Sequence, residues 1–85
     1  MKIKLLTPDK PILLDVETDS VTLPGAVGEM TVLPHHAALL SKLKKGIVRY
    51  RLKEKELGRF QIEGGFVEVL KDQVLVLTSA CEVNS

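Results

Sequence analysis

Residues 46–53 read Gly46-Ile47-Val48-Arg49-Tyr50-Arg51-Leu52-Lys53, and this stretch decides the fold class. From Val48 onward, apolar and basic side chains alternate. Successive side chains of a β-strand point to opposite faces, so a period of two predicts a strand with one buried and one solvated face. Phe60 and Ile62 alternate with polar residues in the same way. The two runs predict paired strands, joined by a hairpin loop at Glu54-Lys55-Glu56.

Proline and glycine divide the rest of the chain into similar short runs. The expected turns, loops and breaks lie at residues 8–11, 24–28, 34, 64–65 and 71–73. Turn signals at intervals of roughly 8–12 residues are typical of all-β domains. We therefore expect an all-β fold, a flattened β-barrel or β-sandwich of about 8–10 short strands with little or no helix. The length is that of one small domain, so residues 1–85 are expected to form a single β-sandwich domain.

Two segments depart from simple alternation. Residues 37–43 carry leucines at helical spacing, but the segment is too short to stand alone as a helix. It is predicted to form one turn or an irregular stretch that ends before Gly46. The run Val74-Leu75-Val76-Leu77 is apolar at every position, which predicts a central strand that is covered on both faces.

The composition is that of an ordinary soluble domain. The hydrophobic share is 45% and the charged share 27%, with a formal net charge of +1. This balance argues against disorder and against a general attraction to nucleic acid or anionic membranes. Aromatic residues make up 4% of the chain, too few for a surface that stacks exposed bases. The single cysteine, Cys81, excludes an internal disulfide framework.

Residue types that carry chemistry are present, but their spacing fits no catalytic or metal-binding motif. Ser41 lies outside any Gly-x-Ser-x-Gly elbow, and a lone Cys81 is typical of a small buried residue. The adjacent His35 and His36 would point to opposite sides of an extended backbone, which disfavours a shared metal ion. The segment from Gly25 to Gly28 lacks the Lys-Ser/Thr pair of a phosphate-binding loop and predicts a turn that needs positive φ. No catalytic residue, metal site or cofactor is therefore expected.

Basic residues gather in the segment from Lys42 to Lys53. They are Lys42, Lys44, Lys45, Arg49, Arg51 and Lys53. One interpretation is a basic face that binds nucleic acid or another polyanion. The other is a solvated strand face, compensated by glutamates that lie close in the sequence. Both interpretations remain open at this point.

Four blocks of sequence, in order along the whole chain, resemble a known family. They are LPGAVGEMTVLPHHAALL (residues 23–40), LKKGIVR (43–49), GGFVEV (64–69) and VLVLTSACE (74–82). Together they resemble the N-terminal β domain of the ATP synthase epsilon subunit. The resemblance implies a flattened β-barrel or sandwich.

The family resemblance implies a non-catalytic central-stalk role in the F-type proton-translocating ATP synthase. Such a domain connects the gamma subunit to the c-ring and couples proton flow to rotation and ATP synthesis. Its partners would be gamma and the c-ring, with no nucleic acid and with membrane contact only through partners. The implied location is the cytoplasmic side of the bacterial inner membrane, or the equivalent energy-transducing membrane.

The resemblance also assigns roles to single residues. Gly28 and Glu29 correspond to the loop that meets the c-ring. His36, Ser41 and Thr7 correspond to positions that approach gamma. Structural roles fall to Gly25, Gly64 and Gly65, the last two marking a bend.

Three features depart from the family pattern. His35 stands where the family usually has glycine, which puts a side chain where positive φ is needed. Thr31 also occupies a position where glycine is common. The family continues into two C-terminal helices, whereas this sequence stops at Ser85. The inhibitory and ATP-binding roles of those helices are therefore not expected here.

Overall fold

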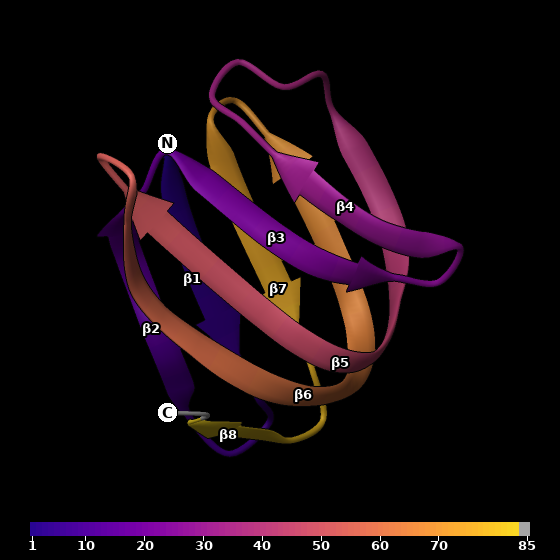
Figure 1. The fold of residues 1–85 in the computed structure, drawn as a ribbon. Helices are drawn as coiled ribbons and strands as arrows, with labels where there is room; N and C mark the ends of the chain where they lie inside the picture. The colour runs from indigo at the N-terminus through magenta and orange to yellow at the C-terminus, as the bar shows by residue number, and fades with distance from the viewer. Residues whose placement is uncertain (84–85) are drawn as a thin grey trace.

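The computed structural model describes residues 1–83, and every regular element among them is a β-strand (Figure 1). The eight strands are β1 (Lys2–Leu6), β2 (Pro11–Glu17), β3 (Ser20–Gly25), β4 (Gly28–Val32), β5 (Leu39–Leu52), β6 (Lys55–Leu70), β7 (Gln73–Leu77) and β8 (Cys81–Val83). The prediction of an all-β fold with little or no helix is confirmed. Two of the strands are long rather than short, with 14 residues in β5 and 16 in β6. The last two positions of the predicted domain lie outside the described residues.

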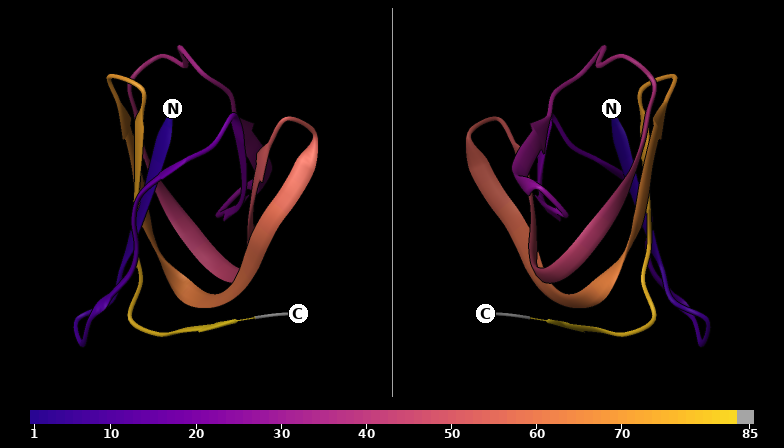
Figure 2. Two further views of the ribbon diagram at one scale, coloured as in Figure 1. Left: turned by 90° about the vertical axis from the view of Figure 1, so that its left-hand side faces the viewer. Right: turned by 90° about the vertical axis from the view of Figure 1, so that its right-hand side faces the viewer.

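One continuous sheet folds over on itself to make the two layers of the sandwich. Its strand order is β2-β1-β7-β6-β5-β3-β4, and β8 pairs with the first half of β6. β2 and β4 stand at the two ends of this order, so the sheet is not closed into a barrel. The long strands β5 and β6 belong to both layers and pass from one to the other at the bottom of the molecule (Figure 2).

The corner of the sandwich lies where β5 and β6 bend together. Leu43 pairs with Gly65 across this corner, and the ladder continues on either side of it. The inward-facing positions step by five residues here, from Leu43 to Val48 on β5 and from Ile62 to Val67 on β6. Gly64 has a φ of +94° and Gly65 a φ of +138°, conformations that favour glycine. The bend predicted at this glycine pair is therefore present.

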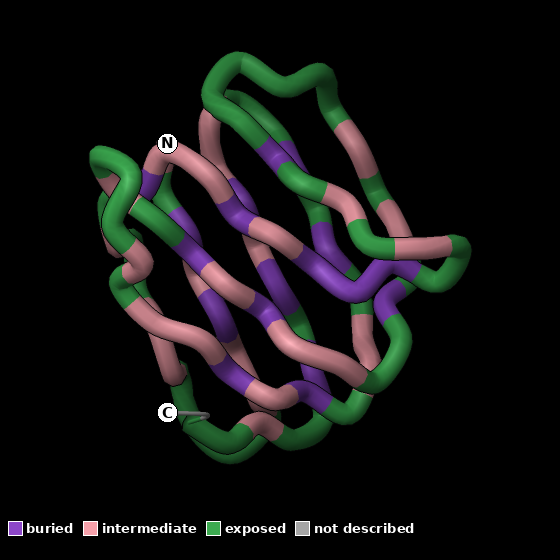
Figure 3. Tube along the Cα trace, in the orientation of Figure 1, coloured by how far each residue is buried: buried purple, intermediate pink, exposed green. Residues whose placement is uncertain are grey.

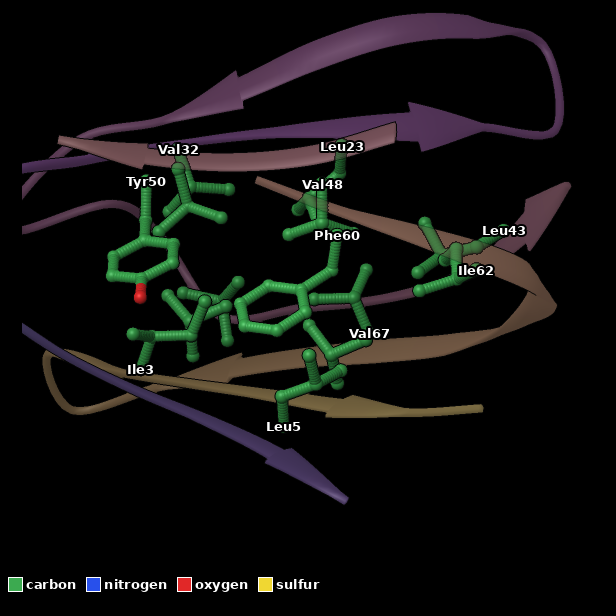
Figure 4. Packing of buried hydrophobic residues seen from close by; sticks show 14 residues of the cluster. Ile3, Leu5, Leu23, Val32, Leu43, Val48, Tyr50, Phe60, Ile62 and Val67 are labelled. Atoms are coloured by element: carbon green, nitrogen blue, oxygen red, sulfur yellow. The ribbon is translucent and has the colours of Figure 1, made fainter. Parts of the chain in front are cut away.

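The core fills the space between the two layers. Buried side chains alternate with exposed ones along the strands, as the period of two requires (Figure 3). The rings of Tyr50 and Phe60 stack in this space, with centroids 6.1 Å apart and an interplanar angle of 9° (Figure 4). Such pairing adds to the stabilisation that burial of the rings gives. Two of the three aromatic residues of the chain are thus used in the core.

Two tight hairpins close the ends of β5 and β6. Lys53 and Glu54 have φ of 54° and 66°, and Lys71 and Asp72 have φ of 50° and 59°. Positive φ at both central residues defines the type I′ turn, whose twist matches that of the strands. The first of these turns lies one residue earlier than the predicted loop, because Lys55 and Glu56 already pair within the ladder.

The prediction for residues 37–43 is wrong. β5 begins at Leu39 and runs without a break to Leu52. Leu39 and Leu43 both face the core, and their separation of four residues fits a strand face as well as a helix face, because four is an even number. Pairing with β6 decides between the two periods.

Two further expectations need correction. Leu75 of β7 is only half-buried and Leu77 is 45% exposed, so this strand is central in the sheet but is not covered on its outer face. The predicted loop at residues 24–28 is shorter than expected. Only Ala26 and Val27 form the turn, and Gly28 and Glu29 already belong to β4.

Candidate partner-binding surfaces

The outer surface of the layer formed by β1, β7, the end of β6 and the start of β5 carries six apolar side chains among charged and polar ones, which include Lys4, Lys42 and Glu68. Cross-strand pairing aligns Leu6 with Leu77 and Leu77 with Phe66. Phe66 is 52% exposed although it is aromatic. We call this surface the apolar face, and its outward apolar side chains are Leu6, Leu40, Phe66, Leu70, Leu75 and Leu77. Leu6, Leu77 and Phe66 lie side by side, and an exposed apolar patch of this kind is typical of a protein interaction site.

A hollow of about 550 Å³ lies at one end of the apolar face, beside the corner of the sandwich. Its lining is Leu6, Thr7, Pro8, Gly64, Gly65, Phe66, Leu77, Thr78 and Ser79. Thr7 also closes the turn between β1 and β2, because its hydroxyl donates to Lys10 O at 2.9 Å and accepts from Lys10 N–H at 3.2 Å. Thr7 is thus fixed by the turn and borders an open apolar hollow.

The connection between β4 and β5 lies at the opposite end of the same layer, beside the β6–β7 turn (Figure 1). His36 is exposed there. Its backbone N–H donates to Leu33 O at 3.2 Å, and its ring Nδ1–H donates to Ala37 O at 2.7 Å. β1 spans the distance between the two ends, about 17 Å for a five-residue strand. Thr7 and His36 therefore do not meet, but they flank the apolar face at its two ends.

Ser41 is placed differently from the other two positions matched to gamma. It is half-buried on β5, opposite the buried Val67, on the same inward side as Leu39 and Leu43. Its hydroxyl donates to Lys42 O at 3.4 Å. The structure therefore does not bring Ser41 onto the apolar face.

The outer surface of the other layer is polar. We call this surface the polar face, and it carries Thr22, Glu29, Thr31, Arg49, Arg51 and Arg59. Glu29 is 66% exposed on β4, and its Oε2 accepts from Arg49 Nη2 at 3.4 Å. Arg59 donates to both carboxylate oxygens of Glu56, at 2.9 and 3.2 Å, and this pairing lowers the pKa of Glu56 and raises that of Arg59.

The glycines matched to turns and bends differ in how closely their neighbours approach. A Cβ on Gly65 would lie 1.9 Å from Leu77 O, and one on Gly25 would lie 2.6 Å from Gly28 O. A Cβ on Gly28 would meet nothing within 4 Å, although its φ is +152°. These contacts support structural roles for Gly25 and Gly65 and leave Gly28 as an open position beside Glu29.

The basic residues between Lys42 and Lys53 do not form one face. Lys42 points outward from the apolar layer, next to Phe66, whereas Arg49 lies on the polar face, because β5 turns the corner between them. Carboxylates pair with two of these cations: Lys45 Nζ lies 3.9 Å from Glu63 Oε1, and Arg49 Nη2 lies 3.4 Å from Glu29 Oε2. The continuous basic surface that a polyanion would need is therefore missing from residues 1–83.

The described residues offer little for catalysis. Burial raises the pKa of the Cys81 thiol, and the charge of Glu82 adds to the effect, so the reactive thiolate is disfavoured. No group of three or more His, Cys, Asp or Glu side chains in residues 1–83 converges as a metal site would require. Over the same range, no helix has the length and hydropathy needed to cross a membrane.

The outward apolar residues were missed by sequence reasoning, although a signal for them existed. Both Phe66–Leu70 and Val74–Leu77 carry apolar residues on both faces. For residues 74–77 this pattern predicted a strand covered on both faces, and for residues 66–70 no such prediction was made. The structure leaves the outer set uncovered.

Comparisons with known proteins agree with this architecture. Residues 1–84 match the family model for the ATP synthase, Delta/Epsilon chain, beta-sandwich domain. The chain is 46% identical over 82 residues to the ATP synthase epsilon chain of Syntrophobacter fumaroxidans and 37% identical over 82 residues to that of Moorella thermoacetica. Each match covers 96% of this chain and 60% of the relative, so the chain spans about three fifths of the length of these curated relatives.

Solved structures show the same fold. A chain from the Euglena gracilis mitochondrial ATP synthase, in a structure of OSCP/F1/c-ring, superposes with a TM-score of 0.90 at 26% identity, covering 98% of this chain and 52% of that one. A chain from the central stalk/c-ring structure of Tetrahymena thermophila mitochondrial ATP synthase gives a TM-score of 0.80 at 21% identity, covering 95% and 64%. The sequence match over nearly the whole chain and the shared fold lead to one conclusion: the chain belongs to the family of the beta-sandwich domain of the ATP synthase delta/epsilon chain.

Proposed function

We propose that this chain is a non-catalytic rotor component of an F-type ATP synthase, which connects the gamma subunit to the c-ring. It couples proton flow to rotation and ATP synthesis by transmitting torque as a rigid body. The observation that carries this proposal is an uncovered apolar face on one side of a sandwich whose other side is polar. One body thereby offers two surfaces of different chemistry to two partners.

Gamma is assigned to the apolar face. Thr7 borders the apolar hollow, and His36 stands on the connection at the other end of the same layer. A partner that covers both ends would bury Phe66, Leu77 and the apolar residues between them. Burial of apolar area contributes about 25 cal/mol per Å² to such a contact, against the entropy cost of association. Ser41, which faces inward, would affect the binding of gamma only through the conformation of β5.

The c-ring is assigned to the start of β4. Gly28 and Glu29 follow the exposed turn at Ala26-Val27, which projects from the end of the β3–β4 hairpin (Figure 1). The Glu29 carboxylate is exposed and pairs with Arg49 of β5, across the intervening strand β3. An exposed carboxylate in this position can pair with a basic residue on a polar loop of the ring.

The proposed location of the chain is peripheral to a membrane. The chain would lie on the cytoplasmic side of a bacterial inner membrane, or of the equivalent energy-transducing membrane, and would touch lipid only through its partners. Inhibition by C-terminal helices and ATP binding are not part of the proposal.

The direct test is co-purification of the 85-residue chain with gamma and the c-ring from the same organism. We expect a ternary complex that survives size-exclusion chromatography, and binding to gamma alone at micromolar concentration or tighter. A correctly folded chain that fails to bind gamma at that concentration contradicts the proposal.

Replacing Glu29 with lysine tests the assignment of the c-ring. The change removes the pair with Arg49 and places two cations together on the polar face, and we expect affinity for the c-ring to fall about tenfold. The free energy of unfolding should change by less than about 1 kcal/mol, because exposed pairs contribute little to stability. Glu54→Lys at the β5–β6 turn makes the same charge change elsewhere and should leave ring binding intact. Equal losses of ring affinity in the two variants would refute the assignment.

A further inference from the structure

Asp72 ties two separate parts of the chain together. It is the second residue of the β6–β7 turn, and its carbonyl accepts from Lys2 N–H at 3.0 Å, which fixes the turn to the start of β1. Its carboxylate reaches across to the connection between β4 and β5. There Oδ1 accepts from the backbone N–H of His35 at 2.7 Å, and Oδ2 lies 3.7 Å from Nδ1 of the same histidine.

His35 needs support of this kind. Its φ is +65°, in the left-handed region, where a residue with a Cβ is less stable than glycine. Histidine tolerates this region better than most residues, but it still carries a cost. A hydrogen bond from a backbone N–H to a carboxylate is charge-assisted and of comparable magnitude. The Asp72 carboxylate therefore offsets the unfavourable backbone conformation of the residue that it binds.

The rest of the connection is weakly attached. All of residues 33–38 are exposed, and the bond from His36 N–H to Leu33 O is internal to the segment. Among the described residues, the bond from His35 N–H to Asp72 is the one hydrogen bond that joins residues 34–37 to the remainder of the molecule. Apart from its two ends, which continue into β4 and β5, the connection is thus held to the rest of residues 1–83 by one acceptor.

We propose that Asp72 is a positioning residue that clasps the β4–β5 connection to the β6–β7 turn. The clasp holds His35 in its left-handed conformation and thereby fixes the direction in which the next residue, His36, is presented at the end of the apolar face. The part of this inference that concerns gamma rests on the function proposed above. The clasp itself does not, and it can be measured in the isolated chain.

Amide hydrogen exchange, followed by NMR on the 85-residue chain, tests the clasp. In Asp72→Ala, the amides of His35 and His36 are expected to exchange at least about tenfold faster, because the bond that restrains the connection is gone. Amides of the sheet interior, such as Val69 and Val76, should keep their protection. Asp72→Asn retains an acceptor oxygen and a residue that tolerates positive φ, so its exchange should lie within about threefold of the parent chain.

The chain contains a matched control at its other type I′ turn. Asp19 Oδ2 accepts from the N–H of Lys53 at 2.8 Å, again a carboxylate that holds a backbone amide of positive φ. Asp19→Ala should speed exchange at Lys53 and leave His36 unchanged. If Asp72→Ala leaves exchange at His36 within twofold of the parent, or if Asp19→Ala accelerates it equally, the clasp is refuted.

Affinity for gamma separates the two proposals. If His36 contacts gamma, Asp72→Ala should weaken binding about threefold to tenfold, and Asp72→Asn should restore it. A parent chain that does not bind gamma overturns the proposed function, whereas the exchange result still decides the clasp. If gamma binds all three chains equally while exchange changes as expected, the clasp stands and its role in presenting His36 is overturned.

Discussion

Gly65→Ala is expected to lower the free energy of unfolding by about 3 kcal/mol or more, enough to unfold a small domain of marginal stability. The added Cβ would lie 1.9 Å from Leu77 O, a backbone atom at the end of β7. Alanine at this position would also have to adopt a φ of +138°, which residues with a Cβ rarely do. Relief requires β6 and β7 to separate at the corner, where the sheet passes from one layer to the other. Urea denaturation followed by circular dichroism measures the change.

Gly28→Ala is the matched control for this change. Its φ of +152° is also positive, but the space around a new Cβ is empty to 4 Å. We expect a loss of about 1 kcal/mol from the backbone conformation alone. The difference between the two variants measures the steric cost at the corner. If Gly65→Ala loses no more stability than Gly28→Ala, the corner is not the constraint that the structure indicates.

The alternation on either side of the β5–β6 hairpin was enough to predict the fold class, because alternation of apolar and polar residues with a period of two indicates a β-strand. The bend was predictable at Gly64-Gly65, where two adjacent glycines interrupt an apolar pattern. Its counterpart on β5 was not recognised, although Lys44-Lys45 marks the same place with two adjacent exposed residues. Alternation breaks at a corner, and on β5 two consecutive exposed lysines followed by Gly46 mark that break.

The partner surfaces were only partly predictable. Family resemblance directed attention to Thr7, His36 and Glu29, and the structure gives each of them an exposed or half-buried position at the surface. Resemblance did not indicate Phe66 or Asp72. A strand with apolar residues on both faces indicates that both faces are buried in the functional state. The pattern does not distinguish burial within the domain from burial by a partner. The contact between Asp72 and His35 joins residues 37 positions apart, and no local pattern reports such a pairing.

Phe66→Asp should abolish most of the binding to gamma, with a loss of affinity of about a hundredfold. Phe66 is the one aromatic residue of the chain that lies outside the core, and it stands between Leu77 and Lys42 at the edge of the apolar hollow. Aromatic anchors of this kind carry a large share of interface energy. An aspartate there removes the ring and would require burial of an unpaired carboxylate when gamma binds. Isothermal titration calorimetry with purified gamma measures the effect.

The effect of the Phe66 substitution on stability must be separated from its effect on affinity for gamma. The exposure of Phe66 makes this separation possible. Because the side chain is 52% exposed, Phe66→Asp should cost only about 1 kcal/mol of the free energy of unfolding. Leu57→Asp alters a side chain of similar exposure, 43%, on the half of β6 that belongs to the other layer, and its affinity for gamma should stay within threefold. A strong loss in Phe66→Asp alone assigns gamma to the apolar face. Unchanged affinity in both variants would mean that gamma binds elsewhere, and the exposed aromatic would then require a different partner.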